Sequence, residues 1–255
     1  MKKQKLYNCV ILLLSITYSL QVDAQVDSLR QVVRGSASAN QKIETYPLLI
    51  DALIEEGDSV AAISYITDGL ALAIEEERKA ELRAKEGYLL FRRGHYALSL
   101  AIYEQELALS RQEGWDLLAS DCLNMLGKIY YNQSSYDTAL TYLSESLDIH
   151  KALGDQKRIG RSYFDVGRVH LHRGDNQKAL DLFEQGLAIS KAAGDEKNLI
   201  RGYNDIAIVY GGLRDLATAS DYFHNALELA EATQILDGLS QTYSNLAVLH
   251  NIKRD

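Results

Sequence analysis

Proline and cysteine are nearly absent from this sequence of 255 residues. The single proline, Pro47, leaves long stretches without the residue that most strongly interrupts helices. The only cysteines are Cys9 and Cys122, which excludes a disulfide framework. Runs of β-branched residues are also scarce, whereas Ala, Leu, Glu, Lys and Gln dominate. The composition therefore favours an almost wholly helical, all-α protein.

The first 24 residues differ from the rest of the chain. They run from a basic start, MKKQK, through the apolar stretch LYNCVILLLSITYSL to Val22-Asp23-Ala24, which places small residues before a cleavage point at Gln25. This pattern is typical of a secretory signal peptide, and the apolar stretch is shorter than the roughly 20 residues of a membrane-spanning helix. We therefore expect residues 1–24 to be cleaved and the protein to be exported, to the periplasm or outside the cell. An uncleaved membrane anchor is the alternative.

The chain without these residues is strongly acidic. Of 27 basic and 35 acidic residues, cleavage removes three lysines and one aspartate, which leaves 24 and 34 and a net charge of −10. Nucleic-acid binding needs clustered Lys and Arg to neutralise phosphates, so it is not expected here. Cys122 would be the one remaining cysteine, and an intramolecular disulfide is then impossible.

The second half of the chain repeats itself every 40 residues. Small residues recur in one column, at Gly87, Gly127, Gly167, Ala207 and Ala247. Around Gly127, apolar residues fall at i, i+3, i+4 and i+7, and a second such face begins about 12 residues later at Ala139. Each unit is thus predicted to be a helix (helix A), a tight turn and a second helix (helix B). The small residue would let the two helices approach closely.

These columns resemble the tetratricopeptide repeat, whose pattern runs from Leu-Gly and Tyr in helix A to Ala and an aromatic residue in helix B. The match is carried by Leu126, Gly127, Tyr130, Ala139 and Leu143, by Tyr163, Val166, Gly167, Ala179 and Phe183, and by Tyr203, Ile206, Ala207, Ala219 and Phe223. The resemblance implies a right-handed superhelical solenoid of antiparallel helix hairpins. A period of 40 rather than 34 is similar to the long-helix variants in kinesin light chains and bacterial peptide-responsive regulators.

The family's closing proline is replaced by glycine in this sequence. Gly154 and Gly194 are expected to end helices in the left-handed conformation, and Asp155 and Asp195 to cap the helices that follow.

The repeat divides the chain into a signal peptide (1–24), an N-terminal segment ending in a loop (25–40) and a solenoid (41–255). The solenoid units are predicted at about 41–76, 79–113, 117–153, 157–193 and 197–233, with an incomplete unit at 237–255. This last helix A carries Leu246, Val248, Leu249 and Ile252, so we expect it to expose an apolar face. That expectation suggests a chain truncated relative to a longer parent.

Two short motifs in the unit at 157–193 have structural explanations. His170 and His172 form a His-x-His pair, but residues two apart on a helix point about 200° apart and cannot share a metal ion. The Arg-Gly-Asp triplet at 173–175 is explained as a turn glycine, Gly174, and a helix-capping aspartate, Asp175.

No catalytic motif is found in the sequence. It contains neither a glycine-rich phosphate loop nor a nucleophile elbow, and we expect no enzyme activity, no cofactor and no metal site. His95, His150 and His224 are expected at the surface. Cys122 is expected to be a packed thiol.

A binding surface is what remains. Helix A lines the concave face of such a solenoid, and nine residues are predicted to form a peptide- or protein-binding site there. They are Tyr88, Asn124, Lys128, Tyr131, Arg161, Phe164, Arg168, Arg201 and Asn204. Their cations form a basic stripe that would bind the carboxylates of an extended, acidic peptide, while the amides pair with its backbone. The alternative is that all nine are ordinary solvated helix residues.

Two functions fit these expectations. The first is an exported, non-enzymatic scaffold that binds a peptide or protein partner along its groove. The alternative is the extracytoplasmic sensor portion of a truncated bacterial signalling protein, a membrane histidine kinase or a transcriptional regulator, as the resemblance implies. In both, the mature chain is expected to contain no membrane span, and the sequence does not indicate an oligomeric state.

Overall fold

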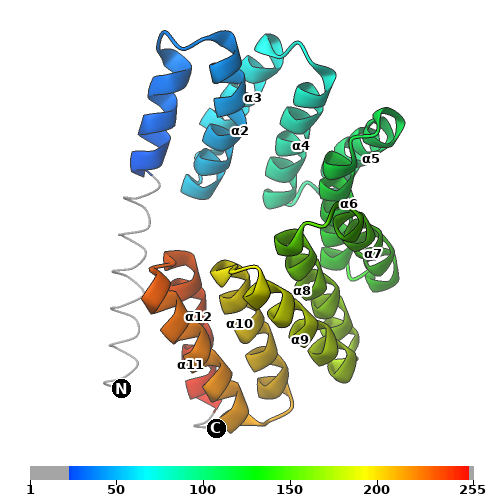
Figure 1. The fold of residues 1–255 in the computed structure, drawn as a ribbon, viewed down its shortest axis with the longest axis vertical. Helices are drawn as coiled ribbons and strands as arrows, with labels where there is room; N and C mark the ends of the chain where they lie inside the picture. The colour runs from blue at the N-terminus through cyan, green and yellow to red at the C-terminus, as the bar shows by residue number, and fades with distance from the viewer. Residues whose placement is uncertain (1–22, 253–255) are drawn as a thin grey trace. The chain divides into compact units, whose positions relative to one another are not determined.

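The structure, a computed structural model, describes residues 23–252, and all the regular secondary structure in that range is α-helical (Figure 1). The predicted signal peptide lies outside the described residues except for Asp23 and Ala24, with which a helical stretch over 23–34 begins. No helix within residues 23–252 is both long enough and apolar enough to cross a membrane. The chain divides into two compact units, and their described parts are residues 23–142 (the N-terminal unit) and 143–252 (the C-terminal unit).

The N-terminal unit contains the helical residues 23–34 and a series of antiparallel helices. These are α2 (Ala39–Glu56), α3 (Ser59–Leu72), α4 (Glu76–Arg92), α5 (Tyr96–Glu113), α6 (Asp116–Asn132) and the first part of α7 (Tyr136–Leu153). For residues 25–40 the sequence predicted an N-terminal segment and a loop, whereas the structure has a helix over residues 23–34. Only residues 35–38 separate this helix from α2. The side chain of Ser38 caps α2 by accepting a hydrogen bond from the backbone amide of Gln41.

The C-terminal unit continues the same pattern. After the remainder of α7 it contains α8 (Gln156–Arg173), α9 (Asn176–Ala192), α10 (Glu196–Gly212), α11 (Leu216–Thr233) and α12 (Leu236–Ile252). Helices α6, α8, α10 and α12 begin at residues 116, 156, 196 and 236, so successive A helices start 40 residues apart. Each helix of α8–α12 is 17 or 18 residues long.

In the loops between hairpins, glycines end one helix and aspartates cap the next, as the sequence predicts. Gly154 and Gly194 have φ values of 70° and 61°, the left-handed region that a side chain disfavours. The side chains of Asp155 and Asp195 then accept hydrogen bonds from the backbone amides of Arg158 and Asn198, at 3.0 and 3.1 Å. These caps satisfy amides that the first turn of a helix leaves without partners.

The core of the C-terminal unit forms where A and B helices meet. A Cβ atom placed on Gly167 would lie 2.5 Å from the ring of Phe183, so only glycine permits this approach between α8 and α9. Phe183 is buried in a cluster with Phe164, Ile206 and Val209. The small-residue column therefore has the packing role that the sequence predicts.

The apolar face expected on the last helix is largely absent. Leu246 and Leu249 of α12 are buried in a cluster with Phe223 of α11. Ile252 is half-buried, and Val248 alone of the four is exposed. The expectation was wrong because it did not separate the side of α12 that packs on α11 from the side that faces solvent.

Candidate functional site

The A helices of the C-terminal unit, α8, α10 and α12, are joined side by side by polar contacts. We call the surface that they form the helix A face. Arg201 of α10 donates a hydrogen bond from Nη2 to Oδ1 of Asp165 on α8, at 2.6 Å. Arg168 of α8 donates from Nε to Oδ2 of Asp205 on α10, at 3.1 Å. The two pairs cross between neighbouring helices in opposite directions and fix their register.

These contacts neutralise two of the four cations of the predicted basic stripe, Arg168 and Arg201. The side chains of Asp165 and Asp205 are only 3% and 8% exposed, whereas Arg168 and Arg201 are partly exposed. Arg168 Nη2 also lies 3.5 Å from Asp165 Oδ1. A buried carboxylate needs a hydrogen-bonded cation, so the two arginines hold the fold together. The prediction that they are cations available to a peptide is therefore wrong.

Two further predicted binding residues are buried. Phe164 is 0% exposed and packs in the core between α8, α9 and α10. Asn204 is also 0% exposed; its amide donates to Thr242 Oγ1 at 2.9 Å, and its carbonyl oxygen accepts from Asn245 at 2.8 Å. Both side chains point between helices because adjacent A helices pack closely there. Neither can contact a ligand, which corrects the prediction.

The other predicted residues lie in both units. Arg161 of α8 is exposed in the C-terminal unit. Tyr88, Asn124, Lys128 and Tyr131 lie on α4 and α6 of the N-terminal unit, where all four are half-buried. Tyr88 stacks on Phe91 with a ring-centroid distance of 6.3 Å, and Tyr131 packs against Tyr136 at 6.1 Å. Among the nine predicted residues, Arg168 and Arg201 lie close together because both contact the carboxylate of Asp165.

The acidic partners Asp165 and Asp205 were not predicted from the sequence. They occupy one column of the repeat, 40 residues apart, and each lies near an arginine on its own helix and faces one on the next. An Asp column beside an Arg column on the same helical face is a pattern that could have predicted these ion pairs.

Burial changes the acid–base behaviour of this network. It raises the pKa of Asp205 from its ordinary value of 3.8 to about 6, against the opposing effect of Arg168 and with a smaller contribution from the charge of Asp165. The folded protein therefore takes up a proton near pH 6, which the unfolded chain takes up only near pH 4. Stability contributed by this carboxyl group is lowest above pH 6 and grows as the pH falls from 6 to 4.

We therefore expect Asp205→Asn to remove one pH-dependent component of stability. Between pH 7 and pH 5, the unfolding free energy of the wild type should rise by about 1 kcal/mol relative to that of the variant, because only the wild type gains the proton. Urea denaturation of both proteins at the two pH values measures this difference. Parallel pH dependences would contradict the assignment to Asp205.

Exposed apolar side chains lie next to the ion pairs. Ile208 on α10 and Val248 on α12 are 44% and 59% exposed. Ile208 follows Asp205 by one helical turn, and Val248 follows Asn245 by one turn, so both lie along the helix A face. They share a repeat column with Arg168, one residue after the small-residue column. The helix A face therefore carries paired charges at Asp165 and Asp205 and apolar side chains at Ile208 and Val248.

The remaining titratable candidates are structural. His150 is buried rather than at the surface as predicted, with Nδ1 2.8 Å from Ser162 Oγ. His170 is buried too, and its hydrogen bond to Asp175 lowers the pKa of that carboxyl group. Asp175 occupies the N-cap position of α9 but makes no side-chain capping bond, which corrects its predicted role.

Cys122 is buried. Burial raises the pKa of its thiol to about 12, as fits a packed cysteine.

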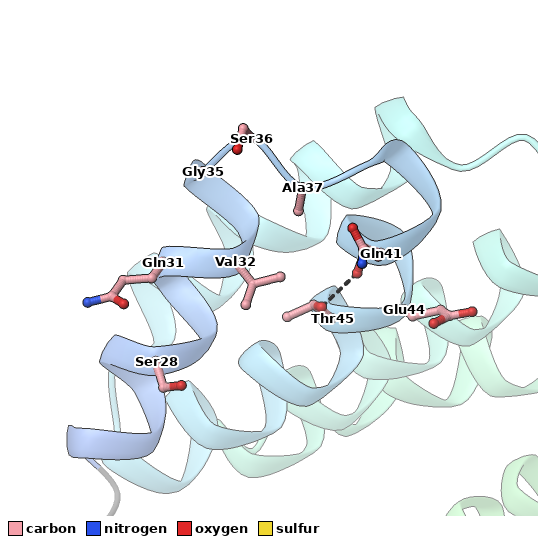
Figure 2. Close-up of a pocket in the computed structure, with 9 residues that line it drawn as sticks. All are labelled: Ser28, Gln31, Val32, Gly35, Ser36, Ala37, Gln41, Glu44 and Thr45. Carbon is pink, nitrogen blue, oxygen red and sulfur yellow. Dashed lines mark hydrogen bonds between the residues drawn. The ribbon is translucent and has the colours of Figure 1, made fainter.

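A hollow of about 670 Å³ lies between the helical residues 23–34 and α2 (Figure 2). Small and polar side chains line it: Ser28, Gln31, Val32, Gly35, Ser36, Ala37, Gln41, Glu44 and Thr45. Its one charged group is Glu44, and Thr45 donates to the backbone carbonyl of Gln41 at 2.6 Å. The lining offers neither a nucleophile paired with a base nor a cluster of metal ligands. Among residues 23–252, no three His, Cys, Asp or Glu side chains are grouped so that they could hold a metal ion.

Comparisons with known proteins agree with this architecture. The family model for the tetratricopeptide repeat matches residues 118–192. A search of curated protein sequences found no match to this chain.

Several solved structures are similar in fold. BtubC (BKLC) from P. vanneervenii is 20% identical, with a TM-score of 0.64, and the match covers 85% of this chain and 91% of that one. A Rap protein complexed with competence and sporulation factor is 14% identical, with a TM-score of 0.71 and coverages of 89% and 71%. Aspartyl phosphate phosphatase F from Bacillus subtilis is 14% identical, with a TM-score of 0.68 and coverages of 85% and 59%.

At these identities the similarity shows the fold alone, so the phosphatase activity in one name is a property of that protein. Such helical repeats typically act as scaffolds for protein–protein interaction. The chain is thus an all-α protein built from tetratricopeptide-like helix hairpins, and its residues 118–192 match the tetratricopeptide repeat family.

Proposed function

We propose that the protein is an exported, non-enzymatic scaffold that binds a peptide or protein partner on the helix A face. One observation carries this proposal. Within the repeat, the packing column keeps small residues, whereas the column one residue later holds Tyr88, Lys128, Arg168, Ile208 and Val248. The fold is thus built from nearly uniform packing positions that present different side chains. This division between a constant scaffold and a varied surface is typical of repeat proteins that bind other proteins.

The exposed apolar pair supports a contact with another protein. Ile208 and Val248 leave apolar surface in water on adjacent, packed helices. Covering such surface contributes about 25 cal/mol per Å² of apolar area removed from water. The ion pairs at Asp165 and Asp205 make this part of the unit a fixed platform, which lowers the entropy lost on binding. A similar fold binds a partner in the Rap protein complexed with competence and sporulation factor.

Export rests on the N-terminal sequence. The basic start, the apolar run and the small residues before Gln25 have the order that signal peptidases recognise. Mass spectrometry of the protein recovered from the cell envelope or the medium should find Gln25 at the N-terminus. A chain that retains Met1 would contradict cleavage.

Site-specific photocrosslinking tests the binding surface. We expect p-benzoylphenylalanine at Val248 or Ile208 to form a crosslink to one defined partner in envelope extract. The control position is Glu228, which is exposed on helix B of the same unit, on α11. Because Glu228 lies off the helix A face, little of the same crosslink should form there. Equal yields at all three positions would contradict the proposal.

A further inference from the structure

Two neighbouring loops of the C-terminal unit concentrate positive charge. Residues 151–161 and 191–201 contain seven basic and three acidic residues, in a chain with a net charge of −8. The equivalent segments of the preceding and following repeats, 111–121 and 231–241, contain one basic and five acidic residues. The excess of positive charge is therefore confined to the joins α7–α8 and α9–α10.

Part of this charge is already paired. Arg201 binds Asp165, Arg158 lies 3.4 Å from Asp155, and Lys151 lies 4.0 Å from Asp148. Four other cations of the two loops are exposed, and in the described part of the chain they form no ion pair: Lys157, Arg161, Lys191 and Lys197. We call these four residues the loop patch.

The loop patch lies at one end of the unit. The start of α8 packs on the end of α9, because a Cβ atom on Gly160 would lie 2.6 Å from Ser190 Oγ. The start of α10 is joined to the start of α8, because Asn198 Nδ2 donates to the backbone carbonyl of Lys157 at 3.2 Å. The same end of the unit therefore holds Lys157 and Lys197 on the first turns of α8 and α10, Arg161 one turn after Lys157, and Lys191 on the last turn of α9.

The acidic residues in the same loops are placed where they disturb this charge little. Asp155 and Asp195 cap α8 and α10, and their carboxylates accept hydrogen bonds from backbone amides of the first turns. The positive ends of the two helix dipoles offset part of their negative charge. Glu196 is the remaining acidic residue, and it is exposed on α10.

We propose that the loop patch binds an acidic segment of the protein partner. This inference rests on the proposed function and names the chemistry of one part of the partner. Neighbouring helices pack about 8–10 Å apart, and in a chain in the polyproline II conformation, which has three residues per turn, side chains i and i+3 lie on the same side about 9 Å apart. An extended segment with Asp or Glu at every third residue therefore places one carboxylate near Lys157 and the next near Lys197. Glu196, which caps no helix, lies exposed among the cations and would be repelled by a uniformly anionic lipid surface, which favours a peptide over a membrane.

The probe for this proposal is a fluorescein-labelled peptide with Glu at every third residue, separated by Gly and Ser. A version with Gln in place of Glu is the neutral control. We expect fluorescence anisotropy to show binding of the Glu peptide alone, with about tenfold weaker affinity when NaCl is raised from 50 to 300 mM, because salt screens exposed charges. The double variant Lys157→Glu/Lys197→Glu should bind at least about fivefold more weakly than the wild type.

A matched variant separates the patch from net charge. Arg93→Glu/Lys178→Glu changes the net charge equally at two exposed sites outside the patch and should bind the peptide within about twofold of wild type. Circular dichroism of both variants checks that the fold is intact. Equal weakening in both double variants would overturn the proposal, as would patch-dependent binding to phosphatidylserine vesicles without binding to the peptide.

The photocrosslink at Val248 distinguishes failure of this inference from failure of the proposed function. A partner that crosslinks equally well to the wild type and to Lys157→Glu/Lys197→Glu would leave the scaffold function standing and overturn the loop patch. Loss of the crosslink in this variant, with retention in Arg93→Glu/Lys178→Glu, would support both. No crosslink from Val248 or Ile208 in any protein would contradict the proposed function itself.

Discussion

Phe164→Ala is expected to lower the free energy of unfolding by about 4 kcal/mol, the range found for deleting a fully buried aromatic ring. The ring of Phe164 fills space that two glycines leave open, since a Cβ atom on Gly186 or Gly202 would lie 2.8 or 2.6 Å from it. It also packs against Phe183 at a centroid distance of 6.2 Å. Removing the ring leaves a cavity that glycine neighbours cannot fill.

Urea denaturation followed by circular dichroism measures the effect of Phe164→Ala. Val248→Ala is the control, and it should change stability by less than about 0.5 kcal/mol because Val248 is mostly exposed. A loss below about 1.5 kcal/mol in Phe164→Ala would contradict the burial of this residue and restore it as a candidate surface residue.

Arg201→Ala is expected to lower the unfolding free energy by about 2 to 3 kcal/mol. Arg201 provides the 2.6 Å hydrogen bond to Oδ1 of Asp165, whereas Nη2 of Arg168 lies 3.5 Å from the same oxygen. Loss of one partner of a buried ion pair leaves a desolvated charge, which costs more than the pair contributed when intact.

Arg161→Ala provides a matched control for Arg201→Ala. Arg161 occupies the same repeat column one unit earlier but is exposed, so its replacement should change the unfolding free energy by less than about 0.5 kcal/mol. Equal losses in the two variants, measured by urea denaturation, would contradict the structural role assigned to Arg201. A binding assay on Arg201 variants must therefore be corrected for the fraction of folded protein.

The sequence was sufficient for the helices because their signals are local. The i, i+3, i+4 and i+7 spacing of apolar residues, the glycines at 154 and 194 and the capping aspartates each depend on residues a few positions apart, and the 40-residue period repeats them. The helix over residues 23–34 was missed because it adjoins the apolar N-terminal run and lies outside the repeat register.

The candidate site was harder to predict because exposure depends on contacts between helices. Register places Phe164 and Asn204 on helix A but does not say which side chains lie between adjacent A helices. Asn204 is buried because Thr242 and Asn245, about 40 residues away, satisfy its amide. The sequence shows Arg168 and Arg201 as cations on helix A but does not show that Asp205 and Asp165 of neighbouring helices lie against them. His150 was misplaced for the same reason, since Ser162 of the next helix covers it.

The proposed function requires that a protein partner binds the helix A face of the C-terminal unit. The ratio of photocrosslink yields at Val248 and Glu228, both exposed positions of this unit, is the decisive measurement. We expect the same partner to be crosslinked at least about tenfold more from Val248 than from Glu228, because crosslinkers react only with groups within a few ångströms and a partner on one face excludes the other. A ratio near one, or a higher yield from Glu228, would contradict it.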